Sequence, residues 1–287
     1  MRARHLSKRR SNTVKGFILD MDGTLAVGKP EGGGYLLLPG VADFIKELRS
    51  HGLPFVVFTN GTAQTPERYA ENLGAAGLEL SPSEMMTPSS VASEYFAASG
   101  CRTVLVLGGE GVASPLTQVG IAIVRPEHLL PHKVDAVYIG WHPSFGLADI
   151  EAAVAAVSAG APMYVSSDVP FFYSSKGRTL GISGMIGAAI AKAVGRRAVV
   201  IGKPSAIAAQ MAARRLGCAE SQMAIVGDDP KLEMAMARLC GAIGIGVISG
   251  LTNRSAWDAL APKQMAHHVV DRIDEIITRK LVRLEGR

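Results

Sequence analysis

The sequence predicts an α/β protein with a doubly wound parallel-sheet core and a second α/β domain inserted into it. Short apolar runs that end in small or acidic residues alternate with alanine-rich stretches of helical length, the pattern of a parallel sheet covered by helices. The pattern restarts near Cys101 and continues to about Val194, as expected of an inserted domain. The chain has 287 residues, enough for two domains of ordinary size.

The expected elements follow one another in a regular order. Core strands are predicted at 16–20, 53–59, 198–202, 223–227 and 242–247. Core helices are predicted at 39–50, 66–76, 88–98, 205–216 and 231–239, and three of them begin with a proline, which the first helical turn tolerates. Inserted strands are predicted at 103–107, 121–124, 134–139 and 163–166, with helices at 147–159 and 182–194. The core is therefore assigned to 11–100 and 195–287, and the inserted domain to 101–194.

The positive charge is concentrated at the start of the chain. The net charge is +5, and six basic residues and no acidic one lie within 1–15. We expect 1–15 to form a disordered basic tail on a near-neutral body, so no specific nucleic-acid partner is predicted. Every apolar run is too short to span a membrane, and no signal peptide is recognisable. The sequence therefore predicts a cytoplasmic protein without a membrane partner.

The three cysteines do not indicate a disulfide framework or a zinc site. Cys101, Cys218 and Cys240 are far apart and form no CxxC pair. We therefore expect the cysteines to be buried apolar side chains. His142, His267 and His268 show no metal-ligand spacing either, so we expect these three side chains to be structural or exposed.

Two carboxylates stand where the first predicted strand ends. Asp20 and Asp22 belong to the run DMDGTL at 20–25, and alternation along an extended chain sends both side chains to the same side. Gly23 allows a tight turn beside a ligand. A lone DxD more often caps a turn, so the remaining strand ends must decide whether these carboxylates form a site.

Polar groups also follow the second and third predicted strands. Thr59, Asn60, Gly61 and Thr62 offer a hydroxyl and amide groups that can bind a phosphoryl group, although the same residues could simply form a turn before the next helix. Lys203 follows the third strand in the run GKP, where a lone lysine would usually be solvated.

An acidic cluster follows the fourth predicted strand. Asp228 and Asp229 come directly after it, with Glu233 one helical turn further on, and such a cluster can hold a hard cation. Because open α/β sheets bind ligands at the carboxyl ends of their strands, the four groups can converge on one point. Carboxylates, an ammonium, a hydroxyl and free backbone amides together suit a magnesium ion and a phosphate dianion.

The sequence resembles the haloacid dehalogenase (HAD) superfamily, specifically its NagD-like or 4-nitrophenylphosphatase group with a large C2-type cap. The resemblance covers nearly the whole chain after residue 15 and rests on DMDGTL at 20–25, FTNGT at 58–62, GKP at 202–204, VGDD at 226–229 and the insertion between the second and third motifs. Where relatives often have Thr-Asn-Asn-Ser, this chain has Gly61 and Thr62 in the last two places, and Glu233 stands where many carry a second aspartate. The resemblance implies a Rossmann-like core with an inserted cap.

The resemblance also implies phosphoryl transfer through an aspartyl-phosphate. Asp20 would be the nucleophile and Asp22 the general acid and base. The presence of Asp22 argues against dehalogenation, because the dehalogenases of the superfamily lack this second carboxylate. The remaining implied roles are catalysis with phosphate contact by Thr59 and Lys203, phosphate binding by Asn60, Gly61 and Gly23, Mg²⁺ binding by Asp20, Asp22 and Asp228, and orientation of metal-bound water by Asp229 or Glu233.

In the resembling family the cap determines the substrate. Asp168, Phe171 and Phe172 are the candidate substrate contacts in this chain, and the alternative is that the aromatic side chains pack within the cap or against the core. Lys176 and Arg178 could meet a second anionic group, but a solvated loop is the simpler expectation.

The sequence as a whole predicts a magnesium-dependent phosphohydrolase that cleaves small-molecule phosphomonoesters such as a sugar phosphate or a nucleotide. Two alternatives stay open, namely a phosphomutase and a catalytically weak phosphate-binding regulatory protein. The expected partner is a small phosphorylated metabolite, and association into a homodimer through the caps is a further expectation from the resemblance.

Overall fold

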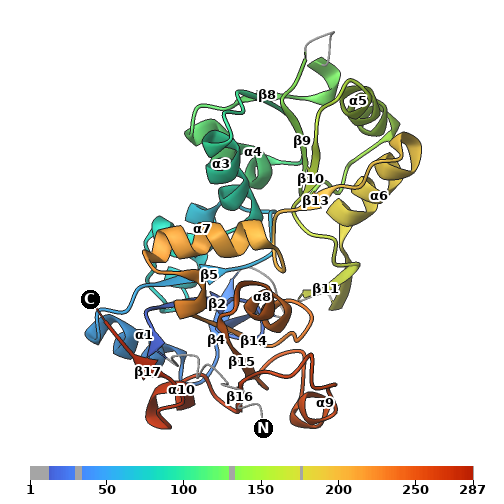
Figure 1. Cartoon of the computed structure of the whole chain (residues 1–287). Helices are drawn as coiled ribbons and strands as arrows, with labels where there is room; N and C mark the ends of the chain where they lie inside the picture. The colour runs from blue at the N-terminus through green and yellow to red at the C-terminus, as the bar shows by residue number, and fades with distance from the viewer. Residues whose placement is uncertain (1–12, 30–33, 129–132, 175–176, 287) are drawn as a thin grey trace, which may run out of the picture.

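The computed structural model describes residues 13–29, 34–128, 133–174 and 177–286. Its core is a six-stranded, wholly parallel sheet (Figure 1). The inner strands are buried on both faces, which explains why their sequences are continuously apolar. In spatial order the strands are β16 (His268–Val270), β15 (Ile243–Val247), β14 (Met223–Gly227), β2 (Gly16–Asp20), β5 (Phe55–Phe58) and β6 (Met85–Met86).

Helices cover both faces of this sheet, so the predicted doubly wound core is confirmed. One face packs against α1 (Val41–Ser50), α2 (Pro66–Gly74) and α10 (Glu275–Thr278). The other face packs against α3 (Pro88–Ala98), α7 (Ala206–Leu216) and α8 (Glu233–Cys240). A short helix, α9 (Arg254–Asp258), buries Trp257 against Gly246 of β15, where a Cβ would lie only 2.7 Å from the indole ring.

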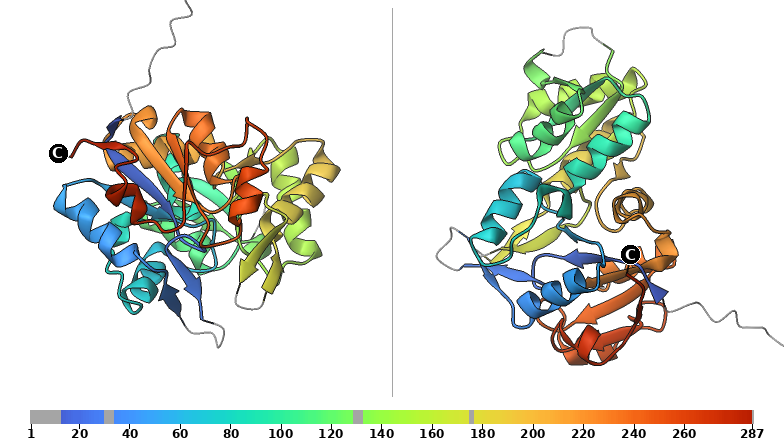
Figure 2. Two further views of the ribbon diagram at one scale, coloured as in Figure 1. Left: turned by 90° about the horizontal axis from the view of Figure 1, so that it is seen from below. Right: turned by 90° about the vertical axis from the view of Figure 1, so that its left-hand side faces the viewer.

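The inserted cap is a second parallel sheet, and it stands at one end of the core (Figure 1 and the right-hand view of Figure 2). Helices α5 (Leu147–Ser158) and α6 (Ile182–Val194) cover one of its faces, and α4 (Glu110–Gln118) lies on the other beside α3. In spatial order its strands are β13 (Val199–Val200), β10 (Met163–Val165), β9 (Ala136–Ile139), β7 (Thr103–Leu107) and β8 (Ala122–Val124).

One predicted core strand belongs to the cap. Residues 198–202 were expected in the core sheet, but β13 pairs in parallel with β10 of the cap sheet, with Val199 opposite Tyr164. The apolar pattern of a two-residue strand carries no information about which sheet it joins. The assignment of 195–200 to the core is therefore wrong, and the chain returns to the core only after β13.

The N-terminal prediction is also partly wrong. Thr13 and Val14 form strand β1, which pairs in parallel with β17 (Arg283–Leu284), and Lys15 N donates a hydrogen bond to Gln222 O. Residues 13–15 are thus part of the fold and not of a disordered tail. Residues 1–12 lie outside the described part of the chain.

Two hairpins were not predicted. Strands β3 (Ala26–Gly28) and β4 (Tyr35–Leu37) form an antiparallel pair directly after the DMDGTL run. Strands β11 (Phe171–Ser174) and β12 (Gly177–Leu180) form another, which extends from the cap towards the core (Figure 1). Lys176 and the side chain of Arg178 lie outside the described residues.

The carboxyl ends of the two sheets meet. Trp141 N, just after cap strand β9, donates a hydrogen bond of 2.9 Å to Thr62 Oγ1, which follows core strand β5. One apolar cluster also runs through both domains and includes Val56 of the core sheet, Phe96 of α3 and Tyr138 of the cap sheet. The cap is thus packed continuously onto the core.

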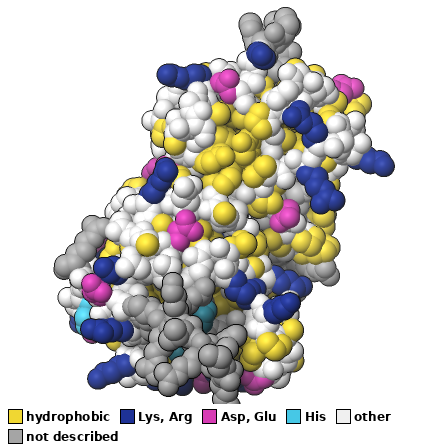
Figure 3. Space-filling model, viewed as in Figure 1, with side chains coloured by type: hydrophobic (Ala, Val, Ile, Leu, Met, Phe, Trp, Pro, Cys, Tyr) yellow, Lys and Arg dark blue, Asp and Glu magenta, His cyan; other side chains and the backbone are white. Residues whose placement is uncertain are grey.

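The surface in Figure 3 shows apolar side chains gathered on the cap, with basic side chains distributed over both domains. Val199 of the edge strand β13 is one of the exposed apolar residues of the cap. Within the described residues, the helices are all too short or too polar to cross a membrane.

Candidate active site

Asp20 ends the central strand β2 and is buried at the edge where the cap meets the core. Its Oδ1 lies 2.5 Å from Lys203 Nζ, and its Oδ2 accepts a hydrogen bond of 3.0 Å from Thr24 Oγ1. The first and third sequence motifs therefore come together as predicted, even though Lys203 follows a strand of the cap sheet.

The Lys203 ammonium is completely enclosed and fully paired. Besides Asp20 it donates to Phe58 O at 2.6 Å and forms an ion pair of 2.9 Å with Glu233 Oε1. Burial alone lowers the pKa of Lys203, but the neighbouring carboxylates of Asp20 and Glu233 outweigh it and raise the pKa above its ordinary value. Lys203 therefore stays charged and offsets two carboxylates.

Asp22 lies beside Asp20 and keeps access to solvent. Its Oδ2 accepts a hydrogen bond of 3.3 Å from Thr59 Oγ1, and that hydroxyl oxygen in turn accepts one of 3.1 Å from Gly61 N. Although solvent reaches the side chain, the protein packed around Asp22 raises its pKa to about 7, and repulsion from Asp20 adds to this effect. A carboxyl group with this pKa can both give and take a proton near neutral pH.

Asp228 follows strand β14 and packs against the backbone of the first motif. Gly23 has a φ of +79°, and a Cβ there would lie 2.5 Å from Asp228 Oδ2. The same oxygen accepts a hydrogen bond of 2.6 Å from Leu251 N. Burial raises the pKa of Asp228 to about 7, with a further contribution from Asp20.

The segment at 249–250, which packs against Gly23 and Asp228, was not predicted from the sequence. Ser249 Oγ donates to Gly23 O at 2.9 Å, and a Cβ on Gly250 would lie 2.1 Å from Asp228 Oδ2. The only signal in the sequence was the Ser-Gly pair after strand β15, which by itself indicates an ordinary turn.

Glu233 and Asp229 are connected to each other. Glu233 Oε2 accepts a hydrogen bond of 3.1 Å from Asp229 N, while its Oε1 pairs with Lys203. Burial raises the pKa of Glu233 to about 8, the attraction of Lys203 opposes this shift, and repulsion from Asp20 adds to it. The carboxylate of Asp229 accepts a hydrogen bond from Lys231 N at 2.7 Å. Glu233 is thus a direct partner of the lysine.

Asn60 and Gly61 make contacts that were not predicted from the sequence. The Asn60 carboxamide exchanges two hydrogen bonds with the backbone of Lys203. A Cβ on Gly61 would lie 2.4 Å from the hydroxyl of Tyr69, a buried residue of α2 that the sequence analysis had passed over. Burial and the nearby charge of Asp22 raise the pKa of a second missed phenol, Tyr35, to about 12, so it stays protonated.

The cap candidates lie on or next to the β11–β12 hairpin. Asp168 is exposed, and within the described residues no hydrogen bond or ion pair joins it to the acidic cluster. The ring of Phe172 meets that of Trp141 edge to face, with centroids 5.6 Å apart, and both Phe171 and Phe172 keep more than a third of their surface exposed. Since Trp141 is bonded to Thr62, this aromatic pair is linked to the loop that carries Thr59.

The acidic cluster suits a divalent cation by its chemistry. Burial and, to a smaller extent, repulsion from Asp20 raise the pKa values of both Asp22 and Asp228, and Lys203 is already shared with Glu233. The site thus holds more negative charge than its one ammonium offsets. Among the described residues, no three Asp, Glu, His or Cys side chains form a ready-made metal cluster. A divalent cation bound here would take its ligands from the carboxylates of Asp20 and Asp228, a backbone carbonyl and water.

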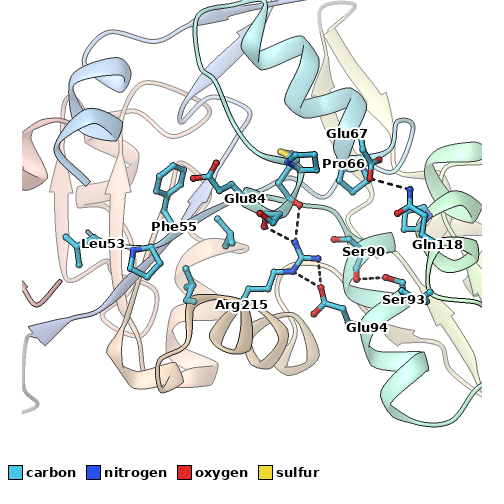
Figure 4. A pocket seen from close by; sticks show the side chains of 18 of the residues that line it. Leu53, Phe55, Pro66, Glu67, Glu84, Ser90, Ser93, Glu94, Gln118 and Arg215 are labelled. Atoms are coloured by element: carbon cyan, nitrogen blue, oxygen red, sulfur yellow. Dashed lines mark hydrogen bonds and ion pairs between the residues drawn. The ribbon is translucent and has the colours of Figure 1, made fainter. Parts of the chain in front are cut away.

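A cavity of about 850 Å³ lies away from these residues (Figure 4). It is lined by residues at the amino ends of β5 and β6, opposite the edge that carries Asp20. Both arginines that line it are paired with carboxylates, since Arg215 donates to Glu94 Oε1 at 2.7 Å and Arg49 lies 3.4 Å from Glu84. This cavity is not the catalytic site.

The fold and the site together define a capped α/β enzyme with an acidic centre around one buried lysine. Residues 17–122 match the family model described as haloacid dehalogenase-like hydrolase, and residues 200–276 match a second model, described as HAD-hydrolase-like. The chain belongs to the haloacid dehalogenase-like hydrolases.

Individual relatives agree with this family. The acid sugar phosphatase of Staphylococcus haemolyticus is 28% identical over 239 residues, which are 83% of this chain and 86% of the relative. A hypothetical protein from Pyrococcus horikoshii has the same fold, with a TM-score of 0.82, 26% identity and coverage of 92% of this chain and 99% of its own. NagD from E. coli K-12 also has this fold, with a TM-score of 0.79, 23% identity and coverage of 92% of this chain and 98% of its own. Glycerol phosphate phosphatase from Mycobacterium tuberculosis was solved in complex with magnesium. It matches with a TM-score of 0.77, 22% identity and coverage of 95% of this chain and 77% of its own.

Proposed function

We propose that this chain is a divalent-metal-dependent phosphatase that hydrolyses phosphomonoesters of small metabolites through an aspartyl-phosphate on Asp20. The observation that carries the proposal is the placement of Asp20 at the end of β2, with Lys203 Nζ at 2.5 Å and Asp22 two residues further on. A carboxylate next to a fixed cation and an acid with a pKa of about 7 has the parts that covalent phosphoryl transfer requires.

In the first step an oxygen of Asp20 attacks phosphorus, and the bond between phosphorus and the ester oxygen breaks. Protonated Asp22 gives its proton to the departing oxygen, so the alcohol leaves neutral. Thr59, whose hydroxyl lies 3.3 Å from Asp22 Oδ2, and the backbone amides after β5 would donate to the phosphoryl oxygens. Lys203 would offset the charge of these oxygens together with that of Asp20.

In the second step water replaces the alcohol. Ionised Asp22 takes a proton from the water, the water oxygen bonds to phosphorus, and the bond between phosphorus and Asp20 breaks. Inorganic phosphate leaves, and Asp20 and Asp22 return to their starting states. One group serves both steps because its pKa lies near neutrality.

The proposed metal is Mg²⁺. Asp20, the backbone carbonyl of Asp22 and Asp228 would hold it, with Asp229 or Glu233 orienting its waters. When bound, the ion supplies positive charge that neutralises the phosphoryl oxygens. The magnesium complex of the glycerol phosphate phosphatase from M. tuberculosis supports this choice by analogy.

The proposed substrate class is a small sugar phosphate, polyol phosphate or nucleotide. The names of the sugar and glycerol phosphate phosphatases among the relatives support it. Asp168, Phe171 and Phe172 on the cap are the proposed contacts to the part of the substrate beyond the phosphate. The cytoplasmic location and the homodimer stay predictions.

The direct test is release of inorganic phosphate from a panel of phosphorylated sugars, glycerol phosphate, nucleotides and p-nitrophenyl phosphate, with Mg²⁺ and without any acceptor alcohol. Hydrolysis of p-nitrophenyl phosphate that stops on chelation supports the proposal. Transfer only in the presence of a second substrate hydroxyl would instead identify a phosphomutase. Phosphate binding without turnover on any substrate would identify a regulatory protein.

A further inference from the structure

We propose that Asn60 is a positioning residue whose side chain fastens the backbone of Lys203 to the core and so holds the Lys203 ammonium beside Asp20. The inference rests on the proposed function, in which that ammonium offsets the charge of Asp20 and of the phosphoryl group. It assigns to the Asn60 side chain a role different from the phosphate contact expected from the sequence.

A single carboxamide satisfies both backbone groups of Lys203. Asn60 Nδ2 donates to Lys203 O at 2.8 Å, and Lys203 N donates to Asn60 Oδ1 at 2.8 Å. Only a carboxamide carries a donor and an acceptor in this arrangement, because an ionised aspartate of the same shape can only accept. The two residues are 143 positions apart, so the contact is specific to the folded protein.

Lys203 needs such an attachment because the chain changes domain at this point. Strand β13 belongs to the cap sheet, and Gly202 N still donates to Ser166 O of the cap at 3.0 Å. One residue later, both backbone bonds of Lys203 go to Asn60 of the core. Pro204 follows and has no N–H to donate. The transfer of the chain from cap to core thus occurs between Gly202 and Lys203.

The packing around Gly202 indicates that this contact is a built feature. A Cβ on Gly202 would lie 2.4 Å from Ser166 O and 2.6 Å from Asn60 Oδ1, so only glycine fits between the cap carbonyl and the carboxamide. The loop after β5 also holds the other end of the lysine, since Phe58 O accepts from Lys203 Nζ at 2.6 Å. Residues 58 and 60 therefore fix the ammonium and the backbone of Lys203 from the same strand end.

The primary test is Asn60→Ala, with Asn72→Ala as the matched control. Asn72 is also partly buried and also donates from Nδ2 at 2.8 Å, but to Gln64 and away from Lys203. Asn60→Ala should speed hydrogen exchange at the Lys203 amide at least about tenfold and lower kcat about 10- to 100-fold with a smaller change in KM, because displacement of a catalytic group mainly weakens transition-state contacts. Asn72→Ala should do neither. Unchanged exchange at the Lys203 amide in Asn60→Ala overturns the proposal.

A second measurement separates positioning from direct phosphate contact. The Kd of inorganic phosphate is measured with Mg²⁺ for Asn60→Ala in the native background and in Lys203→Met. If Asn60 acts through Lys203, its loss weakens binding only where Lys203 is present. Equal weakening in both backgrounds would assign Asn60 to the phosphate itself and overturn the proposal. A native protein that hydrolyses nothing would refute the proposed function, while the exchange result would still decide the role of Asn60.

Discussion

The ammonium nitrogen of Lys203 lies 2.5 Å from Oδ1 of Asp20, although 183 positions separate the two residues and they lie at the ends of strands in different sheets. Neither sheet alone supplies both the carboxylate and its counter-charge. The site is complete only where the cap returns to the core, and the predictions below depend on this arrangement.

Replacement of Asp20 by asparagine should abolish turnover and leave the fold intact. The variant removes the attacking oxygen charge, while Lys203 keeps Glu233 and Phe58 O as partners, so no buried charge is stranded. Phosphate release should fall by more than about 10³-fold, as for loss of a nucleophile. Asp135→Asn, in a carboxylate that binds backbone amides of the cap, is the control and should keep its activity. Appreciable turnover by Asp20→Asn would rule out the aspartyl-phosphate.

The loss caused by Asp22→Ala should depend on the leaving group. With glycerol phosphate the rate should fall by roughly 10²- to 10⁴-fold, because the departing alkoxide needs a proton. With p-nitrophenyl phosphate the loss of kcat/KM should be smaller, since nitrophenolate leaves without one. For the native enzyme, kcat/KM with glycerol phosphate should decline above about pH 7, where Asp22 loses its proton. Equal losses on both substrates would remove Asp22 from the role of general acid.

The metal-free protein should become less stable as the pH rises. Burial raises the pKa of Glu233 from 4.5 to about 8 and that of Asp228 from 3.8 to about 7. Between the ordinary and the raised values the folded state holds more protons than the unfolded state, so stability falls as the pH increases from about 4 to about 8. The Tm in chelator should therefore be higher at pH 5.5 than at pH 8.

Mg²⁺ should reverse this trend, because it binds the ionised carboxylates. The increase in Tm on adding Mg²⁺ should be larger at pH 8 than at pH 5.5. Glu233→Gln should flatten the pH dependence measured in chelator. A metal-free Tm that rises steadily from pH 5.5 to pH 8 in the native protein would contradict the assignment.

Alanine substitutions at two glycines with nearly the same φ can distinguish the cost of backbone strain from the cost of a steric clash. Gly23 has φ +79° and Gly100 has φ +77°, but a Cβ meets Asp228 Oδ2 at 2.5 Å in the first case and has no atom within 4 Å in the second. Alanine at either position should cost about 1–2 kcal/mol for the left-handed conformation. Only Gly23→Ala should also raise the Mg²⁺ concentration needed for half-maximal activity, by at least about tenfold. The same Mg²⁺ requirement in both variants would show that Asp228 is not part of the metal site.

The residues of the site were predictable because each stands at or shortly after the carboxyl end of an apolar strand. Asp20 ends β2, and Thr59 and Asp228 directly follow β5 and β14. These three strands are neighbours in the sheet, so a common location followed from the topology of parallel strands. Lys203 was predicted by the same argument but for the wrong reason, since its strand lies in the cap. Two apolar residues cannot specify a sheet when both domains offer a parallel edge.

Other contacts were invisible for a different reason. The site depends on contacts between loops and helices, and no local sequence pattern encodes them. They are made by the Tyr69 hydroxyl with Gly61, by Leu251 N with Asp228 and by the Asn60 carboxamide with Lys203. The sequence shows that Glu233 stands where many relatives carry an aspartate. It does not show the ion pair of Glu233 with Lys203, because this contact depends on how far the longer side chain reaches from α8. Periodicity locates strand ends, whereas three-dimensional packing decides which atoms meet there.

The apolar cluster that joins Val56, Phe96 and Tyr138 has a consequence for protein engineering. The rings of Phe96 and Tyr138 lie 5.9 Å apart. If the cap were cut away from the core, these rings would lie on separate fragments, and each fragment would expose a large apolar surface. A foreign cap should therefore fold properly on this core only if the helix that corresponds to α3 is transferred together with that cap. By the same logic, heat or denaturant should melt both halves in one cooperative event.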